Sequence, residues 1–355
     1  MRIFALIMAG GVGSRFWPRS REKSPKQLLK IFGDDTMIQA TVQRISKLVA
    51  IEDIFIITND IQKEEMLKQL PNINPENILT EPFGRNTAAC IGLATLFLKK
   101  KSSDAITIVL PADHLVHDEE LFVANLREAA KFAYQEKALV TIGIQPTRPE
   151  TGYGYIQIKD NKSSSSIFPV ASFAEKPNYA TAIRFLESGE FYWNSGMFIW
   201  RIDSILEEIH TFMPELFFGL EKIEQSIGTE AYSQLVNEVY KQLKSISIDY
   251  GIMEKSRRVY LIKSTFRWSD VGSWEEVYLL SEKNEDGNTF IGDVYSELTM
   301  DTFIYSPEKF TAAIGVENLI IINTPDSLLI CRRDQAQKVK QVVDALKMQN
   351  KSELL

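Results

Sequence analysis

The chain has 355 residues, with 47 acidic and 40 basic side chains and a formal net charge of −7. This length predicts about two domains with an ample core. The mildly acidic balance argues against nonspecific nucleic-acid binding, which needs a basic surface. Phosphate ligands remain possible, because a few local cations suffice to bind them.

The N-terminus and the two cysteines narrow the class further. The apolar run in MRIFALIMAGG is too short to cross a membrane and lacks a signal-peptide cleavage pattern. We therefore expect a cytoplasmic, soluble protein with no membrane partner. Cys90 and Cys331 give neither a disulfide framework nor a metal-ligand spacing. Both lie in apolar runs and are expected to be buried free thiols.

The first half of the chain alternates short apolar runs with amphipathic segments such as Leu121–Gln135. Continuous apolar runs suit strands that are buried on both faces, as in a parallel sheet, and they occupy Ile3–Met8, Ile54–Thr58, Ile106–Leu110 and Leu139–Ile144. Alternating strands and helices predict an α/β layered fold. Ligands of such folds bind beyond the carboxyl ends of the strands.

The hydrophobic pattern divides the rest of the chain into two parts. A second α/β portion is expected from about Gly152 to Leu280, with an exposed loop at Lys162–Ser166. Short β-rich runs fill Thr289–Arg332, and a helix follows. Asp334, with Gln337 three positions on, is expected to cap this helix, whose apolar stripe comprises Val339, Val342, Val343 and Leu346. This tail is expected to be a small, separately packed module.

A glycine-rich turn follows the first apolar run. Glycines at such a place allow backbone N–H groups to approach an anion closely. The P-loop pattern fails because GK[ST] is missing, and the dinucleotide fingerprint fails because Phe16 stands where a third glycine is needed. What remains is the segment AGGVGSR at 9–15 with two cations, Arg15 and Lys26, of which the second lies in SPKQ.

These residues resemble the GGxGxRxxPxS…PKQ signature of the sugar-1-phosphate nucleotidyltransferases, and five later segments resemble those of the mannose-1-phosphate guanylyltransferases within that family. Ala174 replaces the family's usual valine in the third segment. The segments occur in the family's order: EPFGRNTA (81–88), PADH (111–114), FAEKP (173–177), WNSGMF (193–198) and WSDVGSW (268–274).

The resemblance implies a Rossmann-like α/β domain with a mixed, mostly parallel sheet over residues 1–285. A small C-terminal module similar to a left-handed β-helix, closed by a final helix, is implied for 286–355. Many bacterial relatives are longer and carry an isomerase domain. Because this chain ends at Leu355, we expect a single activity.

The implied reaction joins GTP to α-D-mannose 1-phosphate, giving GDP-mannose and pyrophosphate, with Mg²⁺ as cofactor. An oxygen of the sugar phosphate attacks the α-phosphorus of GTP in line, with no covalent enzyme intermediate. The resemblance implies catalytic roles for Arg15, Lys26, Asp113, Lys176 and Asp270, with Asp113 and Asp270 as the metal pair. It implies GTP binding by Ala9, Gly10, Gly11, Gly13, Arg15, Lys26, Glu81, Asn86, Thr87, Pro111 and Asp113. It implies mannose 1-phosphate binding by Tyr153, Gly154, Glu175, Lys176, Asn194 and Ser195.

Simpler interpretations of these residues remain open. Glu175–Lys176 could be a solvated ion pair, and Asn194–Gly196 could be a plain turn. Trp268 and Trp274 are expected to be packing residues, and His114 is expected to be a structural partner rather than an acid or base.

Three other functions also remain open. One is the same chemistry with another sugar or base. A second is a noncatalytic regulatory subunit that binds sugar nucleotides; the retained Arg15, Lys26, Asp113, Lys176 and Asp270 favour an enzyme. A third is a nicotinamide dehydrogenase, which Phe16 makes less favourable. Edge strands in the tail need protection, so we expect a homodimer formed partly through residues 289–330.

Overall fold

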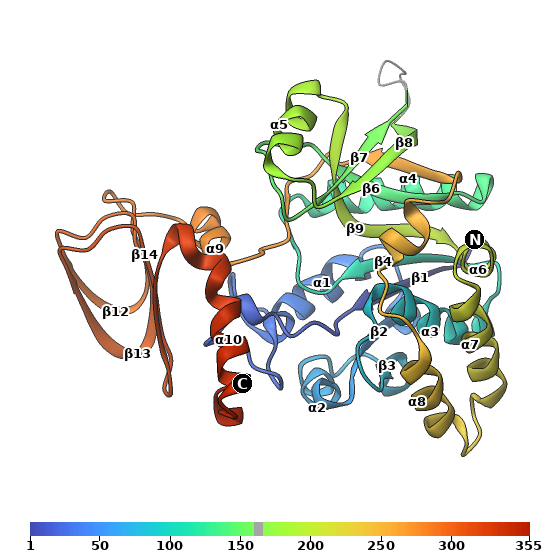
Figure 1. Ribbon diagram of the computed structural model, residues 1–355, viewed down its shortest axis with the longest axis horizontal. Coiled ribbons are helices and arrows are strands. Elements are labelled where there is room, and N and C mark those ends of the chain that lie inside the picture. The colour runs from blue at the N-terminus through green and yellow to red at the C-terminus, as the bar shows by residue number, and fades with distance from the viewer. Residues whose placement is uncertain (160–165) are drawn as a thin grey trace.

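The computed structural model describes residues 1–159 and 166–355. Among them a mixed nine-stranded sheet has the order β3-β2-β1-β4-β9-β6-β10-β8-β7 (Figure 1). The first four strands in this order are mutually parallel. The strand bounds are Ile3–Met8 (β1), Ile54–Asn59 (β2), Ile78–Glu81 (β3), Ile106–Pro111 (β4), Leu139–Ile144 (β6), Gly154–Ile158 (β7), Ile167–Glu175 (β8), Phe191–Arg201 (β9) and Val259–Lys263 (β10).

The predicted α/β fold is confirmed. The four apolar runs form β1, β2, β4 and β6, and the predicted helix at 121–135 forms within α4, Glu119–Glu136. The expected loop at 162–166 lies outside the described residues except for Ser166.

The second α/β portion, expected from about Gly152 to Leu280, shares one sheet with the first. Strand β9 inserts between β4 and β6 and is antiparallel to both, and β10 pairs in parallel with β6. Strand β7 also pairs with the start of β9. The later strands therefore extend the first sheet, because their apolar side chains complete its two faces.

Helices cover both faces of this sheet (Figure 1). One apolar cluster joins the sheet to α1, α2 and α4, and a second joins it to α3, α6, α7 and α8. The remaining helix bounds are Met37–Ser46 (α1), Asp60–Gln69 (α2), Asn86–Lys101 (α3), Tyr179–Ser188 (α5), Ile202–Phe212 (α6), Pro214–Ser226 (α7), Tyr232–Gln242 (α8), Trp274–Leu280 (α9) and Val339–Met348 (α10).

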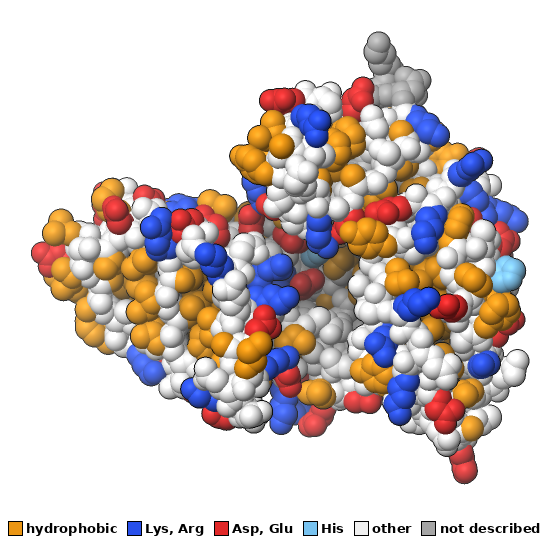
Figure 2. Space-filling view, viewed as in Figure 1, with side chains coloured by type: hydrophobic (Ala, Val, Ile, Leu, Met, Phe, Trp, Pro, Cys, Tyr) orange, Lys and Arg blue, Asp and Glu red, His pale blue; other side chains and the backbone are white. Residues whose placement is uncertain are grey.

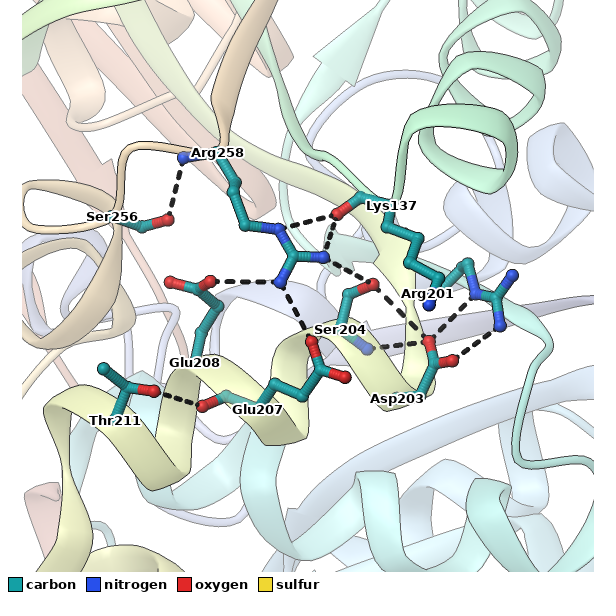
Figure 3. A network of polar contacts seen from close by, with 9 residues as sticks. All are labelled: Lys137, Arg201, Asp203, Ser204, Glu207, Glu208, Thr211, Ser256 and Arg258. Carbon is teal, nitrogen blue, oxygen red and sulfur yellow. Dashed lines mark hydrogen bonds and ion pairs between the residues drawn. The ribbon is translucent and has the colours of Figure 1, made fainter.

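Arg258, just before β10, bonds to α6 and to the residue that follows α4 (Figure 3). Its Nη1 lies 3.0 Å from a carboxylate oxygen of Glu207 on α6, and its Nε and Nη2 donate to the carbonyl of Lys137 after α4. The Arg258 guanidinium thus links α6 on one face of the sheet to the end of α4 on the other face.

The tail has its own small sheet. Strands β12 (Thr289–Glu297), β13 (Phe303–Ile314) and β14 (Leu319–Asn323) run in parallel, and β15 (Leu328–Arg332) is antiparallel to β14. Among the stripe residues of α10, Val339, Val343 and Leu346 are buried and Val342 is half-buried. The short strands β5 (Leu115–Val116) and β11 (Trp268–Ser269) pair with one another in a separate antiparallel sheet.

Asp334 does not cap the final helix, contrary to the prediction. A 3₁₀ turn at Arg333–Lys338 comes before α10, and the residue preceding α10 is Lys338. The carboxylate of Asp334 instead lies 2.8 Å from Arg332 Nη2. The arginine two residues earlier therefore takes up the oxygens that would have accepted backbone N–H groups.

The tail is not separately packed either. One apolar cluster contains Phe16 and Trp17 near the N-terminus, Trp274 on α9, Phe303 on β13 and Val343 on α10. Figure 1 accordingly places α10 between the tail strands and the N-terminal segment. The tail shares a core with the glycine-rich turn, because both expose apolar side chains that neither could bury alone.

The prediction of two buried free thiols holds for one cysteine only. Cys90 is a buried free thiol, but Cys331 is only half-buried. In the described part of the chain, no helix is long and apolar enough to cross a membrane.

Candidate active site

The glycine-rich turn lies at the carboxyl end of β1, beside the carboxyl end of β4. Met8 and Pro111, the last residues of these strands, are register partners. The order β3-β2-β1-β4 reverses direction along the chain at this point, which is where α/β sheets commonly bind ligands. Figure 2 shows the surface hollowed near its centre, with basic and acidic side chains along the edge of the hollow.

Side-chain amide and hydroxyl groups donate hydrogen bonds to the backbone carbonyls of the turn. Gln27 Nε2 donates to the carbonyls of Ala9 and Gly11 at 2.8 and 2.9 Å, and Ser20 Oγ donates to that of Gly13 at 2.7 Å. Within the described residues, the N–H groups from Gly10 to Gly13 have no acceptor. The turn therefore offers consecutive donors to an anion. Ala9 itself is buried with its N–H and C=O both bonded, so it supports the turn.

Gly13 must be glycine. Its φ is +64°, and a Cβ atom would lie 2.6 Å from Lys26 Cβ. Close packing at this point brings Lys26 under the turn. Arg15 is exposed on the following 3₁₀ turn (Ser14–Phe16), and among the described residues it has no acidic partner, so its charge is available to a ligand.

Lys26 contacts both residues of the predicted metal pair, Asp113 through its carboxylate and Asp270 through its backbone carbonyl. Its buried Nζ lies 3.0 Å from Asp113 Oδ2 and donates to the carbonyl of Asp270 at 2.5 Å. Burial opposes ionisation of Asp113, but the charge of Lys26 and its hydrogen bond outweigh it and lower the pKa of Asp113. Residues far apart in sequence thus meet as predicted.

The Asp270 loop carries backbone strain. Val271 is fully buried with a φ of +48°, a conformation that is costly for a β-branched residue. Asp270 Oδ1 accepts a 2.5 Å hydrogen bond from Tyr153 OH. Tyr153, predicted to bind the sugar, therefore orients Asp270.

A cavity of about 300 Å³ opens beside these groups. It brings together residues from both predicted substrate sites. Its predicted lining residues are Thr87, Pro111, Tyr153, Gly154, Glu175, Asn194, Ser195 and Asp270; its other lining residues are Met8, His114, Gly152, Gly196, Phe198, Asp249 and Trp268.

Glycine at position 154 makes room for Glu175. A Cβ atom on Gly154 would collide with the Glu175 carboxylate and lie 3.3 Å from Asn194 Cβ. Lys176 Nζ lies 2.9 Å from Glu175 Oε1, and the Lys176 side chain remains largely exposed. The ion pair considered as a simpler interpretation thus exists, and it lies at the edge of the cavity. Ser195 is buried below it, and its Oγ accepts from Met197 N.

His114 is a structural partner, as the sequence predicts. Its Nδ1 accepts a 3.1 Å hydrogen bond from Trp268 Nε1, which assigns the ring proton to Nε2. Burial lowers the pKa of His114 to about 4, so the ring is neutral at pH 7. Trp268 both packs and lines the cavity, whereas Trp274 is fully buried and only packs.

The predicted nucleoside side of the site is built at the start of α3. Asn86, at φ +65°, accepts from Thr87 N, and Thr87 Oγ1 accepts from Ile248 N. Glu81 is buried beneath Gly10, and Tyr240 OH donates to it at 3.0 Å. Burial raises the pKa of Glu81 to about 7.

Asp249 is a residue of the cavity that sequence reasoning missed. It begins a π-helical turn, Asp249–Met253, and lines the cavity opposite Asn194, whose Nδ2 donates to Asp249 Oδ1 at 2.7 Å. No motif pointed to it; an acidic residue directly after an isoleucine was the only available hint.

The fold and the site together define an α/β protein with an anion-binding glycine turn beside a polar cavity. Comparison with known proteins agrees. Residues 4–287 match the nucleotidyl transferase family, and residues 298–346 match the MannoseP isomerase/GMP-like beta-helix domain.

Proteins that are similar over the whole chain identify the family more narrowly. A mannose-1-phosphate guanylyltransferase of Salmonella muenchen is 41% identical over 99% of this chain and 75% of its own length, and one of Klebsiella pneumoniae is 39% identical with the same coverage. A solved structure described as a mannose-1-phosphate geranyltransferase from Thermus thermophilus is 33% identical, with a TM-score of 0.89 over 98% of this chain and 100% of that one. The chain belongs to the mannose-1-phosphate guanylyltransferase family of nucleotidyl transferases.

Proposed function

We propose that this protein makes GDP-mannose and pyrophosphate from GTP and α-D-mannose 1-phosphate. An oxygen of the sugar phosphate forms a bond to the α-phosphorus of GTP, and the bond from that phosphorus to the β-phosphate oxygen breaks. The observation that carries the proposal is that Lys26 holds Asp113 and Asp270 together between the glycine turn and the cavity. Sequence similarity to enzymes that are named for this reaction supports the proposal.

The main obstacle to this reaction is electrostatic. One like-charge pair at about 4 Å costs about 4 kcal/mol at an effective dielectric of about 20, and two phosphoesters bring several such pairs. Arg15 and the N–H groups of the turn would receive the triphosphate. Lys176 would meet the phosphate of the sugar. The residues thus position and neutralise the reactants, which is the main requirement of phosphoryl-type transfer.

Mg²⁺ fits the donor set. It commonly takes one or two carboxylates together with substrate phosphates, and Asp113 and Asp270 supply two carboxylates. The described residues contain no group of three or more His, Cys, Asp or Glu side chains arranged for a metal, so the phosphates would have to complete the ligand set. Bound Mg²⁺ would offset phosphate charge.

A pyrophosphate-release assay tests the proposal against related chemistry. Four nucleoside triphosphates are crossed with mannose, glucose and N-acetylglucosamine 1-phosphates, with and without Mg²⁺. We expect the highest kcat/KM for GTP with mannose 1-phosphate, and only with Mg²⁺. A preference for another pair would indicate a different sugar nucleotide, and no turnover with any pair would favour the noncatalytic subunit.

We further infer a homodimer formed through the tail. Large apolar side chains are exposed along its strands and turns: Ile291, Tyr295, Leu298, Met300, Phe310, Ile314, Leu328 and Ile330. Figure 2 shows apolar side chains gathered over this end of the molecule. A second copy would cover them and protect the strand edges. Light scattering at assay concentrations should give twice the monomer mass of 40.4 kDa; a monomer would refute the dimer.

A further inference from the structure

Asp249 is held rigidly at the wall of the cavity. Its π-helical turn follows Ile248, whose N–H donates to Thr87 Oγ1 at 2.8 Å. Two residues on, Gly251 packs closely on the Met213 side chain, which would have to move to admit a Cβ atom there. Single π-helical turns are rare and recur at functional sites, where they redirect a side chain. Here the turn directs Asp249 into the cavity.

Asn194 fixes the orientation of the Asp249 carboxylate. Asn194 Oδ1 accepts from Gly196 N at 3.1 Å and from Thr141 Oγ1 at 3.3 Å, so its amide nitrogen must face Asp249. That nitrogen donates to Asp249 Oδ1 at 2.7 Å. Asn194, predicted to contact the sugar, has its oxygen fully engaged and acts chiefly as a positioning residue for Asp249.

The charge distribution makes this end of the cavity suited to hydroxyl groups. Asp249 and Glu175 both line the cavity, and burial together with the charge of Glu175 raises the pKa of Asp249 to about 6. Carboxylate oxygens accept hydrogen bonds, and sugar hydroxyls donate them. Lys176 is paired with Glu175 at the outer edge. An anionic phosphate would be repelled from the Asp249 end and attracted toward Lys176.

We propose that Asp249 accepts hydrogen bonds from hydroxyl groups of the sugar ring and is a specificity-determining residue for the sugar phosphate. This inference rests on the proposed function and adds to it a residue outside every motif of the sequence. Deleting a hydroxyl from the substrate, or the carboxylate from the protein, would leave the remaining partner buried without its hydrogen bond, which is a strong basis for discrimination.

The test compares Asp249→Asn with the matched control Glu254→Gln. Glu254 is an exposed carboxylate just after the same turn and does not line the cavity. We expect D249N to raise the KM for mannose 1-phosphate about 10- to 100-fold while the KM for GTP changes less than about 3-fold. E254Q should match the wild type. Thermal unfolding of each variant checks that it is folded; Asp249→Ala provides a second substitution if D249N is not.

Singly deoxygenated mannose 1-phosphates identify the contact. We expect at least one of them to be used about equally by wild type and D249N, because the lost hydroxyl was the partner of Asp249. An equal penalty for every analogue, or equal changes in both KM values, overturns the inference. Wild-type protein inactive with every sugar phosphate refutes the proposed function, and this inference with it. Active wild type with unaltered D249N refutes the inference alone.

Discussion

The carboxylates of Asp113 and Asp270 each have a neighbour that sets their position. Lys26 pairs with the carboxylate of Asp113 and donates to the backbone carbonyl of Asp270, and Tyr153 OH donates to the Asp270 carboxylate. Because Lys26 balances Asp113 in the protein without substrates, removing the carboxylate leaves a buried cation unpaired. These residues therefore matter for the local structure as well as for the proposed metal site.

We predict that D113N and D270N each lower kcat at least about 100-fold at saturating substrates and Mg²⁺, because each weakens metal placement. Asp344→Asn, which removes an exposed carboxylate on α10, is the matched control and should leave kcat unchanged. Initial rates of pyrophosphate release measure the effect. Near-wild-type turnover in either variant would contradict the metal assignment.

Glu81 should make stability depend on pH. Burial raises the pKa of Glu81 from its ordinary 4.5 to about 7, so between these values the folded protein holds a proton that the unfolded chain has lost. Stability from this group is therefore lost as pH rises through that window. Replacement by neutral glutamine should remove the loss, which is about 3 kcal/mol at most.

The measurement is the difference in Tm between E81Q and wild type at pH 5 and pH 8. We expect this difference to become more positive at pH 8. Glu76→Gln, at an exposed carboxylate, should show no such trend. A difference that is constant with pH would mean that Glu81 is ionised throughout.

At the scale of elements, the glycine turn depends on what lies beneath it. Gly13 and Gly33 have similar left-handed φ values of +64° and +70°, but only Gly13 has a neighbour, Lys26, where a side chain would go. We predict that G13A lowers Tm more than G33A and raises the KM for GTP. Strain from φ alone costs about 1 kcal/mol and is common to both. Equal losses would mean that the contact with Lys26 is unimportant.

The sequence predicted the elements that a short run of neighbouring residues is enough to define. Continuous apolar runs predicted β1 and β6 with their observed bounds, because a doubly buried strand needs apolar residues on both faces. The motifs located Glu175, Asn194 and Asp270. The position of β9 between β4 and β6, and the side chain of Asp249, depend on long-range pairing. No local pattern encodes such pairing.

Over the whole molecule, the tail packs against the segment that follows the glycine turn. Trp274 is fully buried where three segments meet: its Nε1 donates to the carbonyl of Trp17 at 3.1 Å, and its ring packs on Phe16 and Phe303. Trp17 Nε1 in turn donates to the carbonyl of Leu354 at 3.0 Å. The C-terminal residues therefore contact the segment that follows the glycine turn.

We predict that W274F raises the KM for GTP about 3- to 10-fold, because the lost hydrogen bond, worth about 1 kcal/mol, loosens the turn. Trp200→Phe is the matched control: Trp200 is equally buried, but among the described residues its Nε1 has no partner. W200F should leave the KM for GTP unchanged. Equal effects of both substitutions would remove the link between tail and turn.

The central claim is that separate segments of the chain form one cleft for both substrates, and a crystal structure of the complex with GDP-mannose tests it most directly. We predict that the diphosphate lies against the N–H groups of Gly10 to Gly13 and that the mannose ring lies between Glu175 and Asp249. A mannose ring bound outside the cavity that contains Asn194 and Asp270, or a diphosphate away from the glycine turn, would contradict it.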